Sequence, residues 1–151
     1  MPRPSLFEKQ DRESLLARLS SLRADSARQW GKMDAARMLA HCQQPLRVAL
    51  GDLPLKRGLV GLLFGGMAKR SLLADKPWKP NMPTAPEFKL AGSGDFERER
   101  KALFALVQRL GEGGPAALTQ EPHPFFGELS VEQWDTLQWR HLDHHLRQFG
   151  A

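Results

Sequence analysis

Apolar residues recur in this chain at the three- and four-residue spacing of an amphipathic α-helix, and no stretch shows the clean alternation of a half-buried strand. Helices pack by burying such apolar stripes against one another, so the pattern predicts an all-α fold, a helical bundle. A further apolar segment, shorter and rich in glycine, adds a weaker helical signal. The principal predicted helices cover residues 11–22, 30–50, 95–111 and 130–150.

Residue types that start or stop helices lie near the ends of these segments. Asp11 is a candidate N-cap for the first helix, and the second is predicted to begin near Asp34. Ser130 and Gln133 have the spacing of a capping box at the start of the last helix. Gly111 is the predicted stop of the third. Local signals therefore define most of the predicted helix boundaries.

The additional apolar segment is GLVGLLFGGMA, residues 58–68. It is far shorter than the roughly 18 to 20 residues that a membrane span needs. The basic pairs Lys56-Arg57 and Lys69-Arg70 flank it, which leaves contact with a membrane surface open. We expect a buried or lid-forming helix here and no membrane partner.

The proline-rich stretch 74–89 is predicted to be an extended connection. Residues 111–128 are predicted to form a loop, and it contains the sequence HPFFG. A role for this loop, or for His123 within it, does not follow from the sequence. Because His123 lies beside a proline in an irregular segment, we expect a structural loop residue rather than a metal ligand.

The composition fits one globular domain, which we expect to span residues 1–151. The net charge is +5, but the 22 Lys and Arg residues are scattered without a basic stripe, so we expect no nucleic-acid partner. The single cysteine, Cys42, excludes an intramolecular disulfide and is predicted to be a small buried hydrophobe. Cysteine usage and the absence of an apolar leader favour the cytoplasm.

Three of the five histidines lie in HLDHHLRQFG, residues 141–150. At about 100° per residue, His141 and His145 fall in the middle of the apolar face of the last helix. Two imidazoles one helical turn apart can converge on one cation. His144 falls at the edge of the polar arc and is expected at the surface, whereas Gln148 lies on the inner face and could orient a ligand or a bound water.

A third ligand would have to come from another helix, and His41 is the other histidine in a predicted helix. It lies at the border of the apolar face, four residues before Pro45, where we expect the helix to bend. From the residues alone, an inward histidine could equally be a packed, hydrogen-bonded core residue. On this basis, the inward histidines are compatible with either a metal site or a packed core.

Several separated motifs together resemble a domain-of-unknown-function family within the DinB-like (DinB/YfiT-like) superfamily. That superfamily has a four-helix bundle, to which this chain would add a short apolar helix, and a divalent metal held by three histidines. The resemblance covers nearly the whole chain and implies His41, His141 and His145 as metal ligands, with Gln148 completing the motif H-x-x-x-H-x-x-Q. The motifs are WGKMDAARMLAHC (30–42), KPWKPNMPTAP (76–86), HPFFGELSVEQW (123–134) and WRHLDHHLRQFG (139–150).

The resemblance implies a fold and a metal site and leaves the reaction open. Because characterised relatives in the wider superfamily include thiol-dependent S-transferases, we expect a metal-dependent enzyme that acts on a small molecule, by thiol-dependent S-transfer or by hydrolysis. Zn or Ni would be the preferred metal, with Fe or Mn as alternatives. A low-molecular-weight thiol is the implied cosubstrate, and a homodimer is compatible with such bundles. Asp143 points outward on the helical wheel, so no general base is evident. The alternative is a noncatalytic helical bundle that binds a small ligand or a partner, with structural or vestigial histidines.

Overall fold

A computed structural model describes residues 2–82 and 94–151 of the chain. Within these residues it contains helices and no strand, apart from an isolated bridge between His123 and Gly127. This confirms the predicted all-α bundle. The elements are α1 (Lys9–Ser21), α2 (Ala35–Ala49), α3 (Leu59–Leu73), α4 (Phe96–Gly113), the short 3-10 helix η2 (Gly114–Ala117) and α5 (Val131–Gln148).

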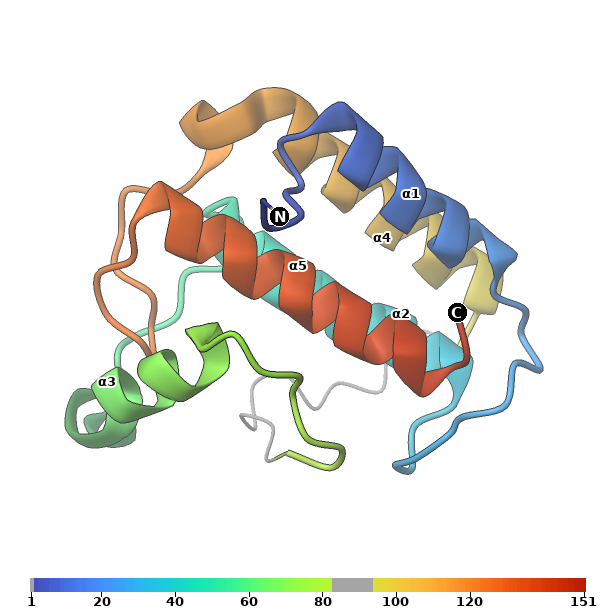
Figure 1. The fold of residues 1–151 in the computed structure, drawn as a ribbon, viewed down its shortest axis with the longest axis horizontal. Coiled ribbons are helices and arrows are strands. Elements are labelled where there is room, and N and C mark those ends of the chain that lie inside the picture. The colour runs from blue at the N-terminus through green and yellow to red at the C-terminus, as the bar shows by residue number, and fades with distance from the viewer. Residues whose placement is uncertain (1, 83–93) are drawn as a thin grey trace.

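Four of these helices, α1, α2, α4 and α5, share one core, and α3 lies at the edge of the molecule (Figure 1). Helix α2 packs against both α4 and α5, while α1 packs against α4 and α5 from the other side. Cys42 is 1% exposed in this core, as predicted for a small hydrophobe. The core side chains include Leu15 and Leu19 of α1, Met38, Leu39 and Leu46 of α2, Leu103, Val107 and Leu110 of α4, and Leu142 and Leu146 of α5.

Two predicted helix starts are confirmed and one is wrong. The Asp34 carboxylate accepts a hydrogen bond from the Arg37 amide (2.8 Å), and Ser130 and Gln133 form the reciprocal bonds of a capping box. Helix α1, however, begins at Lys9, two residues before the predicted cap Asp11. The Asp11 carboxylate instead accepts from the Ser5 amide at 2.9 Å, and this contact ties the N-terminal segment to the first helical turn.

The predicted stop of the third helix at Gly111 is also wrong. Helix α4 continues to Gly113 and ends at Gly114, whose φ of +65° is a conformation that glycine tolerates best. Gly111 is buried inside the helix, where a Cβ would lie 2.2 Å from Cδ of Arg12 and 2.6 Å from the Leu6 carbonyl oxygen. The glycine therefore permits close packing with the N-terminal segment and does not end the helix.

The apolar segment forms a helix as predicted, but its large side chains are not buried. Helix α3 buries only its glycine face: a Cβ on Gly61 would lie 3.0 Å from the Phe125 backbone, and one on Gly65 would lie 2.0 Å from the Phe125 carbonyl oxygen. Within the described residues, no helix is both long and apolar enough to cross a membrane. The exposed apolar residues, each between 52% and 71% exposed, are Leu59, Val60, Leu62, Leu63, Phe64 and Met67.

The connection after α3 folds back over α5, and Arg140 of α5 holds it there. The Arg140 guanidinium donates to the carbonyls of Leu72, Ala74 and Lys76, and the Trp78 indole donates to the Leu72 carbonyl at 2.9 Å. Residues 74–82 contain neither helix nor strand, as predicted, and the rest of the predicted connection (83–89) lies outside the described residues. This anchoring brings an indole ring to the histidine-rich part of α5.

Candidate metal centre

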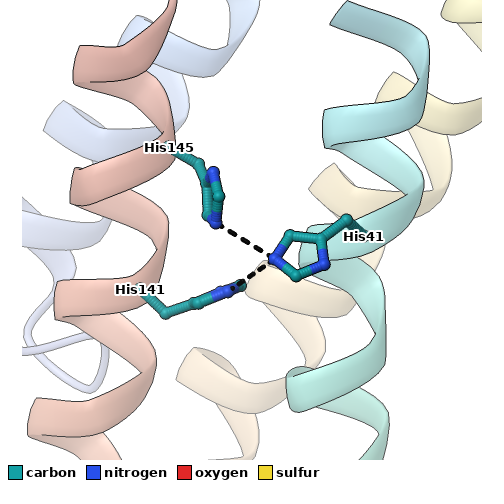
Figure 2. A group of neighbouring side chains, drawn as sticks. All are labelled: His41, His141 and His145. Carbon is teal, nitrogen blue, oxygen red and sulfur yellow. Dashed lines mark hydrogen bonds between the residues drawn. The ribbon is translucent and has the colours of Figure 1, made fainter. Parts of the chain in front are cut away.

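The structure brings together His41 of α2 with His141 and His145 of α5. Their side chains point toward one another across the space between the two helices (Figure 2). The Nε2 atom of His41 lies 3.0 Å from Nε2 of His141 and 3.0 Å from Nε2 of His145. One ring nitrogen from each residue lies within 4.8 Å of the others, so this group could hold a metal ion. Helix α2 is continuous through Pro45, and His41 lies within it.

Burial favours the neutral form of His141 and His145, which is the form that binds metals. His41 and His145 are 4% and 9% exposed, and His141 is partly exposed. Desolvation, reinforced by the neighbouring histidines, lowers the pKa of His141 well below its usual value. Desolvation also lowers the pKa of His145 to about 3, although the hydrogen bond that His145 donates to Gln148 opposes this shift. Both rings are therefore neutral at neutral pH, and each has one ring nitrogen with a free lone pair.

Gln148 fixes the tautomer of His145. Its amide nitrogen donates to the Trp30 carbonyl at 3.0 Å, which leaves the amide oxygen to accept from Nδ1 of His145 at 2.7 Å. Because a carbonyl can only accept, the orientation of the amide follows from this network, and the proton of neutral His145 must lie on Nδ1. The Nε2 lone pair of His145 then points into the cluster, as in metal sites where an outer group orients the ligand histidine.

Gly31 makes room for this contact. Its φ is +80°, and a Cβ at this position would lie 2.6 Å from the amide nitrogen of Gln148. Any other residue would be strained in backbone and would also displace Gln148. The motif that begins at Trp30 therefore supports the cluster through the Trp30 carbonyl and through the absence of a side chain at position 31.

The donor set fits a divalent metal better than it fits a hydrogen-bonded core. Nε2 of His145 carries no proton, and Nε2 of His41 has at most one proton to share between two neighbouring nitrogens. Hydrogen bonds within the trio therefore satisfy the converging nitrogens only if this one proton is shared between two acceptors. Nitrogens bound to tetrahedral zinc at about 2.0–2.1 Å lie roughly 3.3 Å apart. The observed 3.0 Å separations are close to that spacing.

His144 is not the surface residue that the helical wheel predicts. It is half-buried between two indoles, with ring centroids 5.4 Å from Trp30 and 5.8 Å from Trp78. The His145 ring is 5.2 Å away on the other side. A wheel assumes that the polar arc faces water, but here the connection that Arg140 anchors covers this part of α5. His144 still lies outside the trio, as predicted.

A groove of about 520 Å³ lies beside the trio. Three of the four tryptophans, Trp30, Trp78 and Trp139, line it together with His144. The Trp78 ring also lies 6.2 Å from the ring of His141, the partly exposed member of the trio. None of the three histidines of the trio lines the groove, and Trp78 is the lining residue whose ring contacts that of His141. Its charged lining residues are Arg3, Asp75, Lys76, Arg140, Asp143 and Arg147.

His123 lies outside the trio and has a structural role in its loop, as the sequence indicates. Its Nδ1 accepts from the amides of Phe125 (3.0 Å) and Phe126 (3.1 Å), and its ring packs 5.3 Å from that of Trp134. Accepting two amide protons requires an unprotonated Nδ1, and desolvation lowers the pKa of His123 to about 4. The imidazole therefore organises the HPFFG loop on which α3 rests.

One polar residue near the trio escapes the sequence reasoning. Gln138 is 1% exposed, and its amide nitrogen has no hydrogen-bond partner among the described residues. On the α5 wheel it lies about 20° from His145, so its position on the apolar face could have revealed it. Trp30 and Trp78 carry no such signal, because their contacts with α5 depend on how distant segments fold.

These features define a helical bundle with a tri-histidine candidate metal centre supported by a glutamine. The chain belongs to the family described as protein of unknown function (DUF1569), which matches residues 5–151. The matched range includes the three histidines and Gln148, and it agrees with the resemblance to a domain-of-unknown-function family. No curated protein and no solved structure matches the chain.

Proposed function

We propose that this protein is a divalent-metal-dependent enzyme of the DinB-like superfamily that acts on a small molecule. The observation that carries the proposal is the convergence of Nε2 atoms from His41, His141 and His145. One ligand from the second helix and two from the last is the arrangement that the resemblance to the superfamily implies. The all-α bundle with one additional apolar helix is consistent with the same assignment.

Three neutral imidazoles would leave coordination positions for a water or a substrate, as in catalytic rather than closed structural sites. A bound divalent metal would supply Lewis acidity, which lowers the pKa of a water or a thiol and provides a nucleophile at neutral pH. The chain itself would keep His145 in the correct tautomer through Gln148. It would also limit water around His41 and His145, which are buried.

The substrate would enter through the tryptophan-lined groove. Flat indole faces bind apolar or planar groups, and the groove has the volume of a small-molecule site. Trp78 and His144 would contact a ligand that extends toward His141.

The chemistry would rely on the metal-activated nucleophile, since Asp143, one of the two carboxylates that line the groove with Asp75, is already paired. Asp143 forms ion pairs with Arg18 (2.8 Å) and Arg147 (3.0 Å), which leave it poorly suited to accept a proton. We propose thiol-dependent S-transfer or hydrolysis as the reaction. A cytoplasmic location would keep a low-molecular-weight thiol reduced and available.

The first test is metal content. Protein purified without a histidine tag and analysed by mass spectrometry should carry about one divalent metal per chain, or bind one on titration with Zn or Ni. His imidazoles favour these two metals, with Fe and Mn as alternatives. A chain that binds none of these metals would contradict the proposal and leave the noncatalytic ligand-binding bundle as the better interpretation.

The second test is activity. The metal-loaded protein should be incubated with low-molecular-weight thiols and generic electrophiles, and separately with simple esters and amides. Turnover that requires both metal and an intact His41 would establish the reaction class. Turnover that His41→Ala retains in full would place the chemistry elsewhere.

A further inference from the structure

Helix α3 exposes an apolar surface that the bundle does not use. Its glycine face rests on the backbone of Pro124 and Phe125, and large side chains cover the rest of the helix. Contiguous apolar patches on a protein surface mark sites of interaction. The patch consists of Leu59, Val60, Leu62, Leu63, Phe64 and Met67, which are 52% to 71% exposed.

Positive charge frames this patch at both ends. Lys56 and Arg57 precede α3, Lys69 and Arg70 close it, and residues 53–74 contain no Asp or Glu. The Lys69 ammonium donates to the Glu128 carbonyl at 3.1 Å, and the Arg57 guanidinium is close enough to Gly127 that a Cβ there would lie 2.9 Å from it. These two cations thus lie at the seam between α3 and the loop, along the border of the apolar face.

The charge distribution disfavours a second copy of the chain as the occupant. A two-fold symmetric dimer brings the same surface of both copies together. If the two α3 helices pair antiparallel, Lys56-Arg57 of one copy approaches Lys69-Arg70 of the other. If they pair parallel, each basic pair approaches its own equivalent. Either arrangement concentrates like charge around an apolar contact, whereas an anionic surface would neutralise it.

We propose that α3 docks the protein onto an anionic lipid surface. The apolar side chains enter the boundary between headgroups and acyl chains, and the four cations lie at the level of the phosphates. With 15 residues, α3 is about 22 Å long, shorter than the roughly 30 Å hydrocarbon core, so it lies in the plane of the interface. This departs from our sequence-based expectation of no membrane partner, because that expectation assumed a buried or lid-forming helix.

The test is co-sedimentation of the full chain with vesicles. Equal parts of phosphatidylcholine and phosphatidylglycerol form the anionic vesicles, and phosphatidylcholine alone forms the neutral ones. We expect the wild type to bind anionic vesicles at least about tenfold more tightly than neutral ones, with binding that weakens as salt rises. No binding to anionic vesicles, or equal binding to both, would overturn the proposal.

Two variants separate the apolar and electrostatic contributions. Leu63→Ser/Phe64→Ser removes apolar contact, and Lys56→Glu/Arg70→Glu reverses charge at both ends of the helix. Each should weaken binding to anionic vesicles by about tenfold or more, because both contributions are needed for stable interfacial binding. All four positions are exposed, so circular dichroism should show an unchanged fold.

Matched controls come from exposed residues away from α3. Val131→Ser removes an apolar side chain that is 46% exposed at the start of α5, and Lys101→Glu reverses an exposed charge on α4. Both should bind vesicles like the wild type, and equal losses in controls and α3 variants would contradict a specific surface.

Sedimentation without lipid gives the remaining outcome: a dimer that Leu63→Ser/Phe64→Ser dissociates would assign the face to a second copy instead. None of these results depends on metal binding, so the proposal stands or falls separately from the enzymatic one.

Discussion

The histidine trio and the contact between α3 and its loop invert the usual relation between polarity and burial. His41 is 4% exposed, whereas Leu63 is 67% exposed. In the trio, the side chains turn toward one another, and Gln148 accepts a hydrogen bond from the outer nitrogen of His145. Helix α3 is attached through glycines, whose lack of side chains permits close backbone contact with the loop. Burial in this molecule therefore depends on the hydrogen-bond and packing partners available to each side chain, and hydropathy alone does not determine it.

The two regions also differ in what a substitution would disturb. A substitution in the trio removes one metal-binding nitrogen and leaves the helices packed. At the α3 contact, an added methyl group would collide with backbone that cannot adjust easily. Substitutions in the trio should therefore alter ligand affinity first, and substitutions in the α3 contact should alter stability first.

The largest effect should come from removing a histidine of the trio. We expect His41→Ala and His145→Ala each to reduce divalent-metal affinity by more than 100-fold. This loss exceeds the roughly 10- to 100-fold that follows when a residue that only orients a metal ligand is removed. Calorimetric titration with Zn or Ni measures this. His144→Ala is the matched control, because it removes an imidazole from the same turn of α5 and should keep near-wild-type affinity. Comparable losses for His144→Ala and the other two would mean that the trio is wrongly composed.

Much of the fold could be predicted because its signals are local. Helical periodicity, the Asp34 cap and the capping box of Ser130 and Gln133 depend on residues within a few positions of one another. The start of α1 and the end of α4 could not be predicted from Asp11 and Gly111. Contacts with distant segments override the local helix signals at both residues. Gly111 is a close-packing site for the Arg12 side chain rather than a helix stop.

For the candidate site, the wheel could place His141, His145 and Gln148 on one face because α5 is a regular helix. It could not place His144, whose surroundings depend on the return of Trp78 over α5. The exposure of the large α3 side chains could not be predicted either, because the sequence shows the glycines of α3 but not the loop backbone that they contact. Segments far apart in the chain determine both features.

A smaller effect on the same site should follow from Gln148→Ala. Loss of the amide leaves the buried Nδ1 of His145 without its partner and frees the ring to change tautomer, so metal affinity should fall about 10- to 100-fold. Gln29→Ala is the control, since Gln29 is an exposed glutamine near the same end of the bundle. Unchanged metal affinity with a lower melting temperature would limit Gln148 to a structural role.

The α3 contact can be tested with two adjacent glycines. In Gly65→Ala the new Cβ would lie 2.0 Å from the Phe125 carbonyl oxygen, so the helix must shift and stability should fall by about 1–3 kcal/mol. Gly66 has nothing within 4 Å of its Cβ position, and Gly66→Ala should be neutral or stabilise by up to about 1 kcal/mol. Urea unfolding measures both, and metal affinity should stay constant. Equal effects of the two substitutions would show that α3 does not rest on the loop.

The smallest effect should appear in the pH dependence of the loop beneath α3. Because burial lowers the pKa of His123 to about 4, the unfolded chain binds the proton more readily than the folded one below pH 6.5. The resulting stability is present above about pH 6.5 and is lost as pH falls toward 4, with a loss of about 1 kcal/mol between pH 7 and 5.5.

His123→Asn keeps an acceptor near the amides of Phe125 and Phe126 but does not titrate. Its unfolding free energy should therefore be lower at pH 7, through lost ring packing on Trp134, and should decline less steeply toward pH 5.5. The trio titrates in both proteins, so the difference between their two pH profiles isolates His123. Parallel profiles would show that this buried imidazole contributes nothing to the pH dependence.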